Sequence, residues 1–230
     1  MIYKNMEEGV FLSRPNRFIA HIELASRKGE IEVCHVKNTG RCKELLIPGT
    51  KVFVQRSDNP ARKTKYDLIV VEKGDVLVNM DSQAPNAAAA EWVKGGPYFS
   101  KDAVVKREVT FGNSRFDLYV EDGDRKAFLE VKGVTLEDHG IARFPDAPTK
   151  RGIKHIQELI RCREEGYESY LLFVIQMKGV SRFEPNDQTH PAFGETLRAA
   201  ANQSVKILAY DCLVGSESMV IDQEIPVKLD

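Results

Sequence analysis

The chain has 230 residues, of which 42% are hydrophobic and 29% are charged, and its 33 basic and 34 acidic side chains give a net charge of −1. This composition supplies enough apolar side chains for a sizeable core, and it excludes a disordered tail, a collagen-like chain and a disulfide-stapled miniprotein. At about 150 residues per domain, the length predicts one large domain or two small ones.

The sequence contains no sign of export or of membrane insertion. Its longest apolar run, residues 170–175, is far shorter than the roughly 20 residues that cross a bilayer. Glu7 and Glu8 stand where a secretory signal needs an apolar stretch. The four cysteines form no close pair, which favours free thiols over zinc ligands or disulfides. We therefore expect a protein of the reducing cytoplasm.

The first 80 residues predict short strands and turns rather than helices. Strands are expected where apolar residues alternate or cluster between turn residues, at 18–24, 30–36, 51–55, 68–73 and 76–80. This pattern predicts an all-β small barrel of OB-like type over residues 1–81. Such barrels bind nucleic acids, sugars or proteins, so the fold alone assigns no ligand.

The second part, residues 82–230, mixes helical and strand patterns. Asn86 is expected to cap a short helix that ends at Val93, before two glycines. Further strands are expected at 103–111, 115–120, 127–131, 170–175 and 205–210, with helices at 150–165 and around 195–201. We expect an α/β three-layer domain with a mixed sheet.

Two stretches of the neutral chain are basic. Residues 37–65 carry eight basic against two acidic side chains, a net charge of +6, and residues 143–163 carry six against two, a net charge of +4. They indicate either a polyanion-facing side or two ordinary solvated faces. The candidate nucleic-acid-binding residues are Arg41, Lys43, Arg62, Lys63, Lys65, Arg115, Lys150, Arg151, Lys154 and His155.

A predicted hairpin carries the candidate chemistry. A two-residue type II′ turn at 123–124 places Asp117 directly opposite Glu130 on neighbouring strands. Because residues two apart share a face of a strand, Arg115 and Lys132 are expected on the same face. The opposite face is expected to be core and holds Phe116, Leu118, Val120, Leu129 and Val131.

Two carboxylates facing each other repel unless a cation lies between them. Oxygen ligands suit Mg²⁺ or Mn²⁺, and the carbonyl of Val131 offers a further ligand beside Asp117 and Glu130. Lys132 is placed to orient or deprotonate a water that attacks a phosphodiester. Aspartate followed by Glu-x-Lys on the next strand, and then by a helix, is the pattern of the PD-(D/E)XK nuclease fold. The catalytic candidates are therefore Asp117, Glu130 and Lys132, although the short motif also fits a charged, solvated hairpin face.

Six separated segments are together more specific than this motif: NTG at 38–40, SRFD at 114–117, LEVKGVTL at 129–136, FPDAPT at 144–149, RGIKH at 151–155 and ILAY at 207–210. In these segments the sequence resembles the sugar fermentation stimulation protein A (SfsA) family over essentially its whole length. The resemblance implies an OB-like domain followed by a PD-(D/E)XK nuclease-like domain, with Asp117, Glu130 and Lys132 matching the nuclease-like triad. It also implies DNA binding without sequence preference and a link to sugar (maltose) metabolism, but no established catalytic activity.

Other residues have two interpretations each. His155 donates to a phosphate or serves in packing or capping, and Glu91 is an extra carboxylate near the metal or an ordinary exposed side chain. Asn38 and Thr39 contact a phosphate or sugar, or form an Asx turn. Trp92 is expected in the core rather than in base stacking.

The expected function is sequence-nonspecific, salt-sensitive DNA binding, with a nuclease-like divalent-metal site that hydrolyses phosphodiester bonds. Two alternatives stay open. One is a non-catalytic DNA-binding regulator whose carboxylates are structural, and the other is a barrel that binds sugar or another protein.

Overall fold

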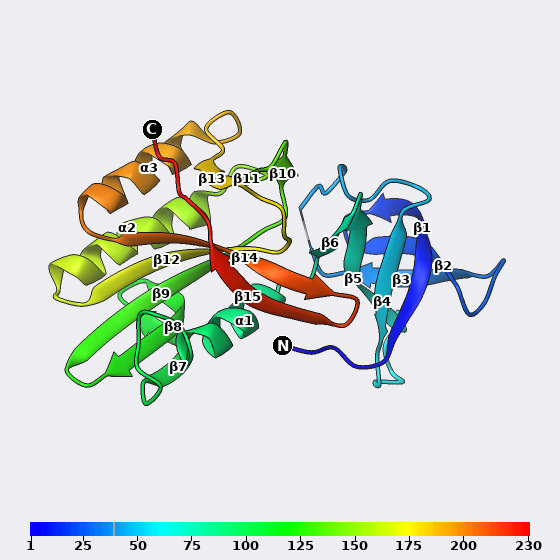
Figure 1. Cartoon of the computed structure of the whole chain (residues 1–230), viewed down its shortest axis with the longest axis horizontal. Helices are drawn as coiled ribbons and strands as arrows, with labels where there is room; N and C mark the ends of the chain where they lie inside the picture. Colours follow the sequence, from blue (N-terminus) through cyan, green and yellow to red (C-terminus); the bar gives the residue numbers. More distant parts are fainter. Residues whose placement is uncertain (39) are drawn as a thin grey trace. The chain divides into compact units, whose positions relative to one another are not determined.

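The computed structural model describes residues 1–38 and 40–230, so Thr39 lies outside the described residues. The chain forms two compact units. The first contains Met1–Ala84 with Gln176–Gly179 and Cys212–Val220, and the second contains Pro85–Ile175, Val180–Asp211 and Ile221–Asp230. One six-stranded sheet lies in the first unit, and most of a second six-stranded sheet lies in the second unit (Figure 1).

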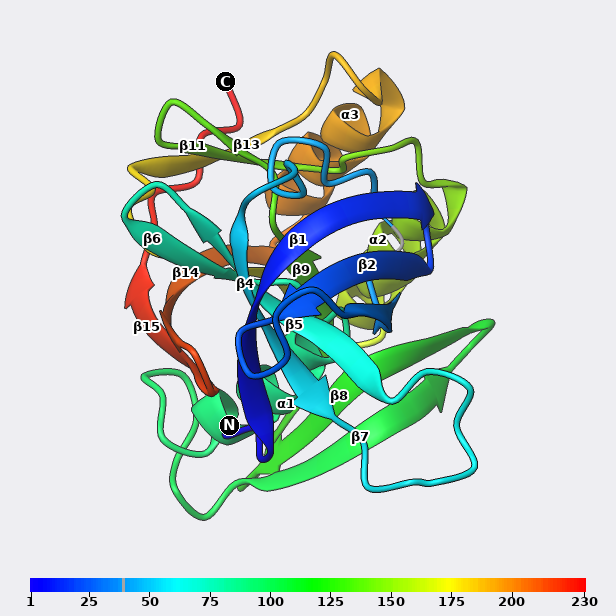
Figure 2. The same ribbon diagram turned by 90° about the vertical axis from the view of Figure 1, so that its right-hand side faces the viewer.

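The first unit is a closed β-barrel of the expected OB-like type. Its sheet has the order β3-β2-β1-β4-β5-β6, and a parallel pairing of β3 with β5 closes five strands into a barrel, which faces the viewer in Figure 2. Alternate side chains such as Ile22 and Leu24 are fully buried inside it. The strands are β1 (Met6–Asn16), β2 (Ile19–Leu24), β3 (Ile31–Val36), β4 (Lys51–Arg56), β5 (Tyr66–Lys73) and β6 (Val76–Asn79).

Strand β1 is absent from the sequence-based expectation, which counted β6 as the fifth strand. Its pairing with β2 shifts register between Phe11 and Ser13 and again before Asn16, and this irregularity hides the period of two. Gly9 also weakens the pattern, because it adds no apolar side chain to the alternation. A glycine is needed at this position, since a Cβ would lie 2.7 Å from Cγ2 of Ile22. The residue that weakens the strand pattern is thus the one that lets the two strands approach.

The second unit has the expected three-layer α/β architecture. Its sheet order is β15-β14-β12-β9-β8-β7, with β12 parallel to β9 and β14, and with β8 antiparallel to β7 and β9. Helix α2 packs beside α3 and over β8, β9 and β12 (Figure 1). The principal elements are α1 (Ala84–Val93), β7 (Val104–Phe111), β8 (Ser114–Asp122), β9 (Arg125–Val134), α2 (Lys150–Glu164), β12 (Glu168–Ile175), α3 (Pro191–Asn202), β14 (Lys206–Gly215) and β15 (Ser218–Glu224).

A small second sheet, β10 (Glu137–Asp138), β11 (Ile141–Phe144) and β13 (Arg182–Pro185), was not expected, because strands of two to four residues carry too little pattern. Trp92 packs on Tyr210 of β14 with ring centroids 4.8 Å apart, but it is only half-buried and lies at the border of the core rather than within it. None of the helices in residues 1–38 and 40–230 combines the length and apolar character needed to span a membrane.

The helices begin where local capping allows. Thr149 caps α2, since its side chain accepts a hydrogen bond of 3.0 Å from the N–H of Gly152. Gly166, at φ +91°, follows the end of α2 as expected. The expectation that Asn86 caps α1 is wrong, because the helix already begins at Ala84 and Asn86 lies within its first turn. The side chain of Asn86 is therefore available for another contact.

Candidate functional site

The β8–β9 hairpin confirms the predicted register. Val120 pairs with Ala127, and the two-residue turn has Gly123 at φ +60°, the value that the first position of a type II′ turn requires. Continuing the same register sets Asp117 opposite Glu130.

The hairpin is distorted at Asp117 itself. Counted from the turn, the regular pairing of β8 with β9 ends at Leu118, the residue next to Asp117. On the other side, Glu108 of β7 is the neighbour of Asp117 and has φ +57°. The ring of Phe116 packs on Phe128 at 5.4 Å instead of sharing a face with Leu118 and Leu129, so the expectation of strict alternation through residue 116 is wrong. The strands diverge at Asp117, which leaves main-chain groups of β9 open to other partners.

One of these groups belongs to Val131. Its N–H donates a 2.8 Å hydrogen bond to Oδ2 of Asp117. The N–H and C=O of one residue in an extended strand point to the same edge. The Val131 carbonyl therefore points to the edge that carries the Asp117 carboxylate, as a ligand at this position requires.

Asp117 is held by two donors. Besides Val131, the amide Nδ2 of Asn86 donates to its Oδ1 at 2.6 Å. Burial raises the pKa of the Asp117 carboxyl above its ordinary value, and the nearby charge of Glu130 raises it further. A divalent cation would offset both effects on the pKa, since it stabilises the ionised form and screens the repulsion between the carboxylates.

Glu130 is more deeply buried, with only 2% of its surface exposed. Its Oε1 accepts a 2.5 Å hydrogen bond from Nζ of Lys132 and also contacts Nδ1 of His155. Burial alone would raise the pKa of Glu130, but the His155 hydrogen bond and the Lys132 charge outweigh it and hold the pKa below its ordinary value. Its Oε2 is buried and has no hydrogen-bond partner among the described residues.

These groups fit a hard cation. The orphaned Oε2 of Glu130, the Asp117 carboxylate and the Val131 carbonyl are all oxygen donors, which Mg²⁺, Mn²⁺ and Ca²⁺ prefer. In the part of the chain that the structure describes, no three His, Cys, Asp or Glu side chains form a metal-binding group. Glu91 is exposed on α1. The donor set therefore suits an ion that retains several waters rather than zinc in an all-protein cage.

The structure adds Asn86 to the site and buries His155, which fits the packing interpretation of His155 rather than the contact with a phosphate. The sequence predicted only a helix cap at Asn86. The one feature that could have indicated its contact with Asp117 is a polar amide side chain in the first turn of the helix that precedes the strands. His155 is buried against Glu130, and Nε of Arg151 lies 3.4 Å from its Nε2. Asn86 and His155 each fix the orientation of a carboxylate.

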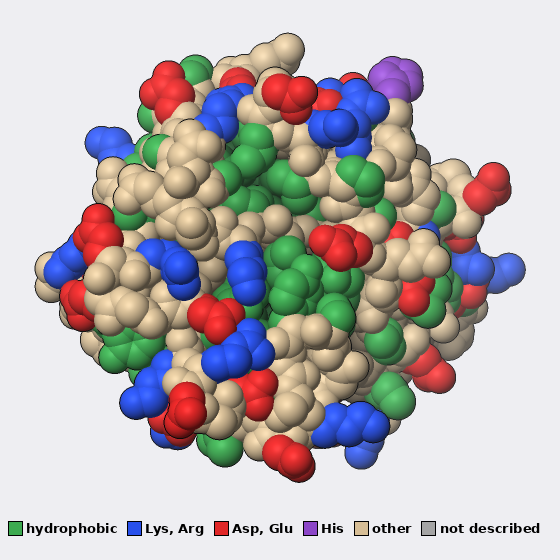
Figure 3. All heavy atoms as spheres, turned by 60° about the vertical axis from the view of Figure 1, so that its left-hand side comes forward, with side chains coloured by type: hydrophobic (Ala, Val, Ile, Leu, Met, Phe, Trp, Pro, Cys, Tyr) green, Lys and Arg blue, Asp and Glu red, His purple; other side chains and the backbone are tan. Residues whose placement is uncertain are grey.

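The basic candidates of the second unit surround α2 and β8. Lys150 and Arg151 are exposed in the first turn of α2, while Nζ of Lys154 donates to the Asn113 carbonyl. Arg115 is exposed and lies 3.7 Å from Glu108. On the face shown in Figure 3, basic and acidic side chains are interspersed around a hydrophobic area, so no field of a single sign covers it.

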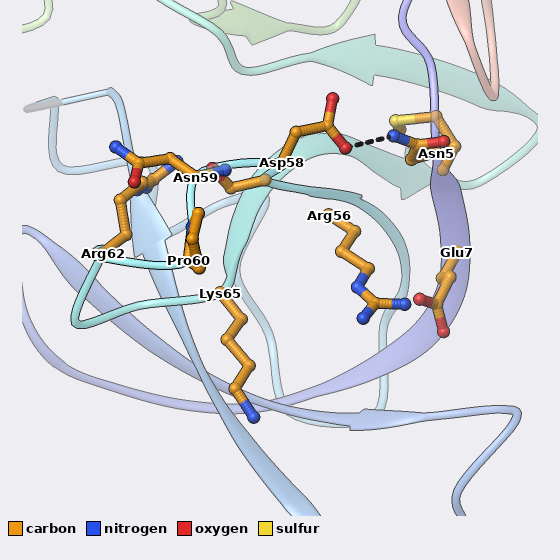
Figure 4. Close-up of a pocket in the computed structure, with 10 residues that line it drawn as sticks. Asn5, Glu7, Arg56, Asp58, Asn59, Pro60, Arg62 and Lys65 are labelled. Carbon is orange, nitrogen blue, oxygen red and sulfur yellow. Dashed lines mark hydrogen bonds between the residues drawn. The ribbon is translucent and has the colours of Figure 1, made fainter.

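The basic candidates of the barrel fall into two groups. The guanidinium of Arg62 is already paired within the protein, because it donates two hydrogen bonds to the buried Asp67. Arg62 also lines a cavity of about 660 Å³ (Figure 4). In this cavity Nδ2 of Asn5 donates a hydrogen bond to Asp58, and the side chain of Lys65 points away from Arg62. The other exposed basic candidates of the barrel are Lys63, Arg41 and Lys43. The Asx alternative for Asn38 is confirmed, since its Oδ1 accepts the N–H of Gly40 at 2.8 Å.

Comparison with known proteins covers both units. Residues 12–80 match the family described as "SfsA N-terminal OB domain", and residues 83–218 match "Sugar fermentation stimulation protein RE domain". A sugar fermentation stimulation protein homolog of Desulfitobacterium hafniense is 57% identical over 229 residues, covering 100% of this chain and 99% of the relative. A sugar fermentation stimulation protein homolog of Ruminiclostridium cellulolyticum is 55% identical over 229 residues, covering 100% of this chain and 100% of the relative.

A solved structure, described as Pyrococcus furiosus SfsA in complex with Ca²⁺, superposes with a TM-score of 0.87 at 28% identity, over 99% of this chain and 98% of that one. The fold thus defines a two-part protein, with an OB-like barrel followed by an α/β domain with a mixed sheet. The chain belongs to the sugar fermentation stimulation protein (SfsA) family.

Proposed function

We propose that this protein binds DNA without sequence preference and hydrolyses phosphodiester bonds at a divalent-metal site formed by Asp117, Glu130 and the carbonyl of Val131. The observation that carries the proposal is the buried Oε2 of Glu130, which has no partner among the described residues and belongs to the carboxylate whose charge raises the pKa of Asp117. The Ca²⁺ complex of the P. furiosus relative supports a site of oxygen ligands, because Ca²⁺ takes oxygen donors.

A bound Mg²⁺ or Mn²⁺ would supply Lewis-acid stabilisation of the phosphodiester oxygens and a more acidic water. The side chains of this chain provide the positioning. His155 and Lys132 hold Oε1 of Glu130, which leaves Oε2 for the ion. Asn86 fixes Oδ1 of Asp117. The Lys132 ammonium is held beside the carboxylates, where it orients the attacking water and offsets negative charge on the phosphate.

Nicking of a supercoiled plasmid in Mg²⁺ or Mn²⁺ tests the catalytic part. We expect wild type to nick and Glu130→Gln to lose at least about 100-fold in rate, since it removes an anionic ligand. Glu121→Gln is the matched control, because Glu121 is a half-exposed carboxylate on β8 that pairs with Lys106 and not with the candidate site. Absence of nicking by wild type, or equal nicking by Glu130→Gln, contradicts the catalytic proposal.

A second candidate is a DNA-binding regulator without catalysis, which would connect DNA binding to the sugar metabolism in the family name. The contacts of Glu130 with Lys132 and His155 favour it, because they pair this buried carboxylate without an ion. Calorimetric titration with Mn²⁺ separates the two candidates. Binding that Asp117→Asn abolishes supports the metal site, and absence of binding supports the regulator.

A further inference from the structure

One half-buried arginine organises a loop region of the barrel remote in sequence from the carboxylates. Nη1 of Arg14 donates to the carbonyls of Gly40 and Arg41 at 3.0 and 2.6 Å. Its Nη2 donates to the carbonyls of Arg17 and Asn38, both at 2.9 Å. A single guanidinium therefore ties the turn between β1 and β2 to the segment that follows β3, and it fixes the backbones of Arg17 and Arg41 relative to each other.

The two tied segments border a basic pocket of about 410 Å³. Its lining residues, which include no acidic side chain, are Arg14, Asn16, Arg17, Gly40, Arg41, Lys43 and Leu46. Arg17, Arg41 and Lys43 are exposed, and none of the three forms an ion pair with any residue that the structure describes. The larger cavity of the barrel, in contrast, includes Glu7 and Asp58 in its lining. The smaller pocket thus presents cations that only an external anion can neutralise.

An exposed aromatic ring stands beside this pocket. Phe18 is 43% exposed, and its N–H is held by Oδ1 of Asn16 at 2.9 Å. The guanidinium of Arg17 lies over the Phe18 ring, 4.8 Å from its centroid. Two further exposed apolar side chains, Val33 and Ile31, follow along the outer face of β3. Burying a phenylalanine is ordinarily favourable, so a ring held outward next to unpaired cations indicates a ligand with both flat apolar and anionic parts.

We propose that Phe18 and the Arg17–Arg41–Lys43 pocket form a docking site for single-stranded DNA. The phosphates bind the three cations, a base stacks on Phe18, and the strand continues over Val33 and Ile31. Base stacking on aromatic side chains beside a cationic groove is how proteins hold single strands without sequence preference. Duplex DNA presents phosphates outward but keeps its bases stacked inside, so it can use the cations and not the ring. The inference rests on the proposed DNA binding and specifies its substrate class.

Fluorescence anisotropy with a labelled oligothymidylate of about 20 nucleotides, and with a duplex of equal length, tests the site. The measurements are made in EDTA, so that they do not depend on the carboxylate site. We expect Phe18→Ala to weaken single-strand binding by about 5- to 100-fold and to leave duplex binding within about twofold. The pair Arg17→Gln and Arg41→Gln is expected to weaken both and to lower the slope of log affinity against log salt by roughly 0.7 for each phosphate that the protein no longer neutralises.

Ile47→Ala and Lys4→Gln are the matched controls. Ile47 is 55% exposed, Lys4 is exposed, neither residue lines the 410 Å³ pocket, and both belong to the first unit. Unchanged single-strand affinity of Phe18→Ala, or an equal loss on single strand and duplex, overturns the proposal. Equally effective competition by polyglutamate, a polyanion without bases, also overturns it. Failure of plasmid nicking bears only on the carboxylate site, because the binding assay contains no metal.

Discussion

At the scale of single residues, the two candidate ligands lie in opposite electrostatic surroundings. Asp117 is half-buried, and its partial burial together with the nearby charge of Glu130 raises its pKa, whereas His155 and Lys132 hold Glu130 ionised and lower its pKa. Perturbed carboxyls with opposed shifts are a feature of functional sites. The two residues are therefore expected to affect stability with opposite signs.

The raised pKa of Asp117 means that the folded protein binds its proton more tightly than the unfolded chain does. Its contribution to stability is full below the unfolded pKa and is lost as pH rises through the folded pKa. In metal-free buffer we expect Asp117→Asn to be more stable than wild type at neutral pH, with the difference shrinking as the solution becomes acidic. Urea unfolding at several pH values measures this, and a less stable variant at neutral pH would contradict a raised pKa of the Asp117 carboxyl in the folded protein.

Glu130 has the reverse sign, because its stabilising contribution is present above the unfolded pKa and is lost as pH falls through the lowered folded pKa. Lys132→Met keeps much of the side-chain volume and removes the charge. We expect a loss of about 1.5–3 kcal/mol at neutral pH, as for other hydrogen bonds to buried charged groups, and a smaller loss in acid, where Glu130 is protonated. Lys106→Met, on an exposed pair, is expected to change stability by less than about 1 kcal/mol. Equal losses in the two variants would argue against a special role for Lys132.

At the scale of elements, the β8–β9 hairpin sets the geometry of the site, because its turn determines the register. A residue with a Cβ is strained at φ +60° even in open space, and no atom lies within 4 Å of a Cβ built on Gly123. We expect Gly123→Ala to cost about 1–3 kcal/mol and Asp124→Ala to cost less than about 0.5 kcal/mol. Thermal unfolding provides the measurement, and an unstrained Gly123→Ala would indicate a different turn.

The elements also show which features the sequence could predict. Local signals predicted the turn, the two strands β8 and β9, and the apolar face of α2. The turn and the strand periods together placed Asp117 opposite Glu130. Strand β1 was missed because its bulges break the alternation, and the displacement of Phe116 follows from strand divergence that no local pattern encodes. The contact of Asn86 with Asp117 joins residues 31 positions apart, so it depends on tertiary packing.

At the scale of the whole molecule, a ligand that binds only the folded state stabilises it by mass action. Mn²⁺ at about 100 times its dissociation constant should add roughly 2.7 kcal/mol to wild type if the site holds one ion. Asp117→Asn should show little of this gain, while Glu121→Gln should keep it. Differential scanning calorimetry with and without EDTA makes the comparison, and equal stabilisation of all three proteins would place the ion elsewhere.

The position of the only tryptophan in the sequence has a practical consequence. Trp92 belongs to the second unit and packs against Tyr98 and Tyr210, while the barrel has no indole. Indole emission therefore follows the melting of the α/β half alone, and far-ultraviolet circular dichroism follows both halves. Superimposable traces from the two probes would indicate that the halves melt as one cooperative body, and separated traces would yield the stability of each half without cutting the chain.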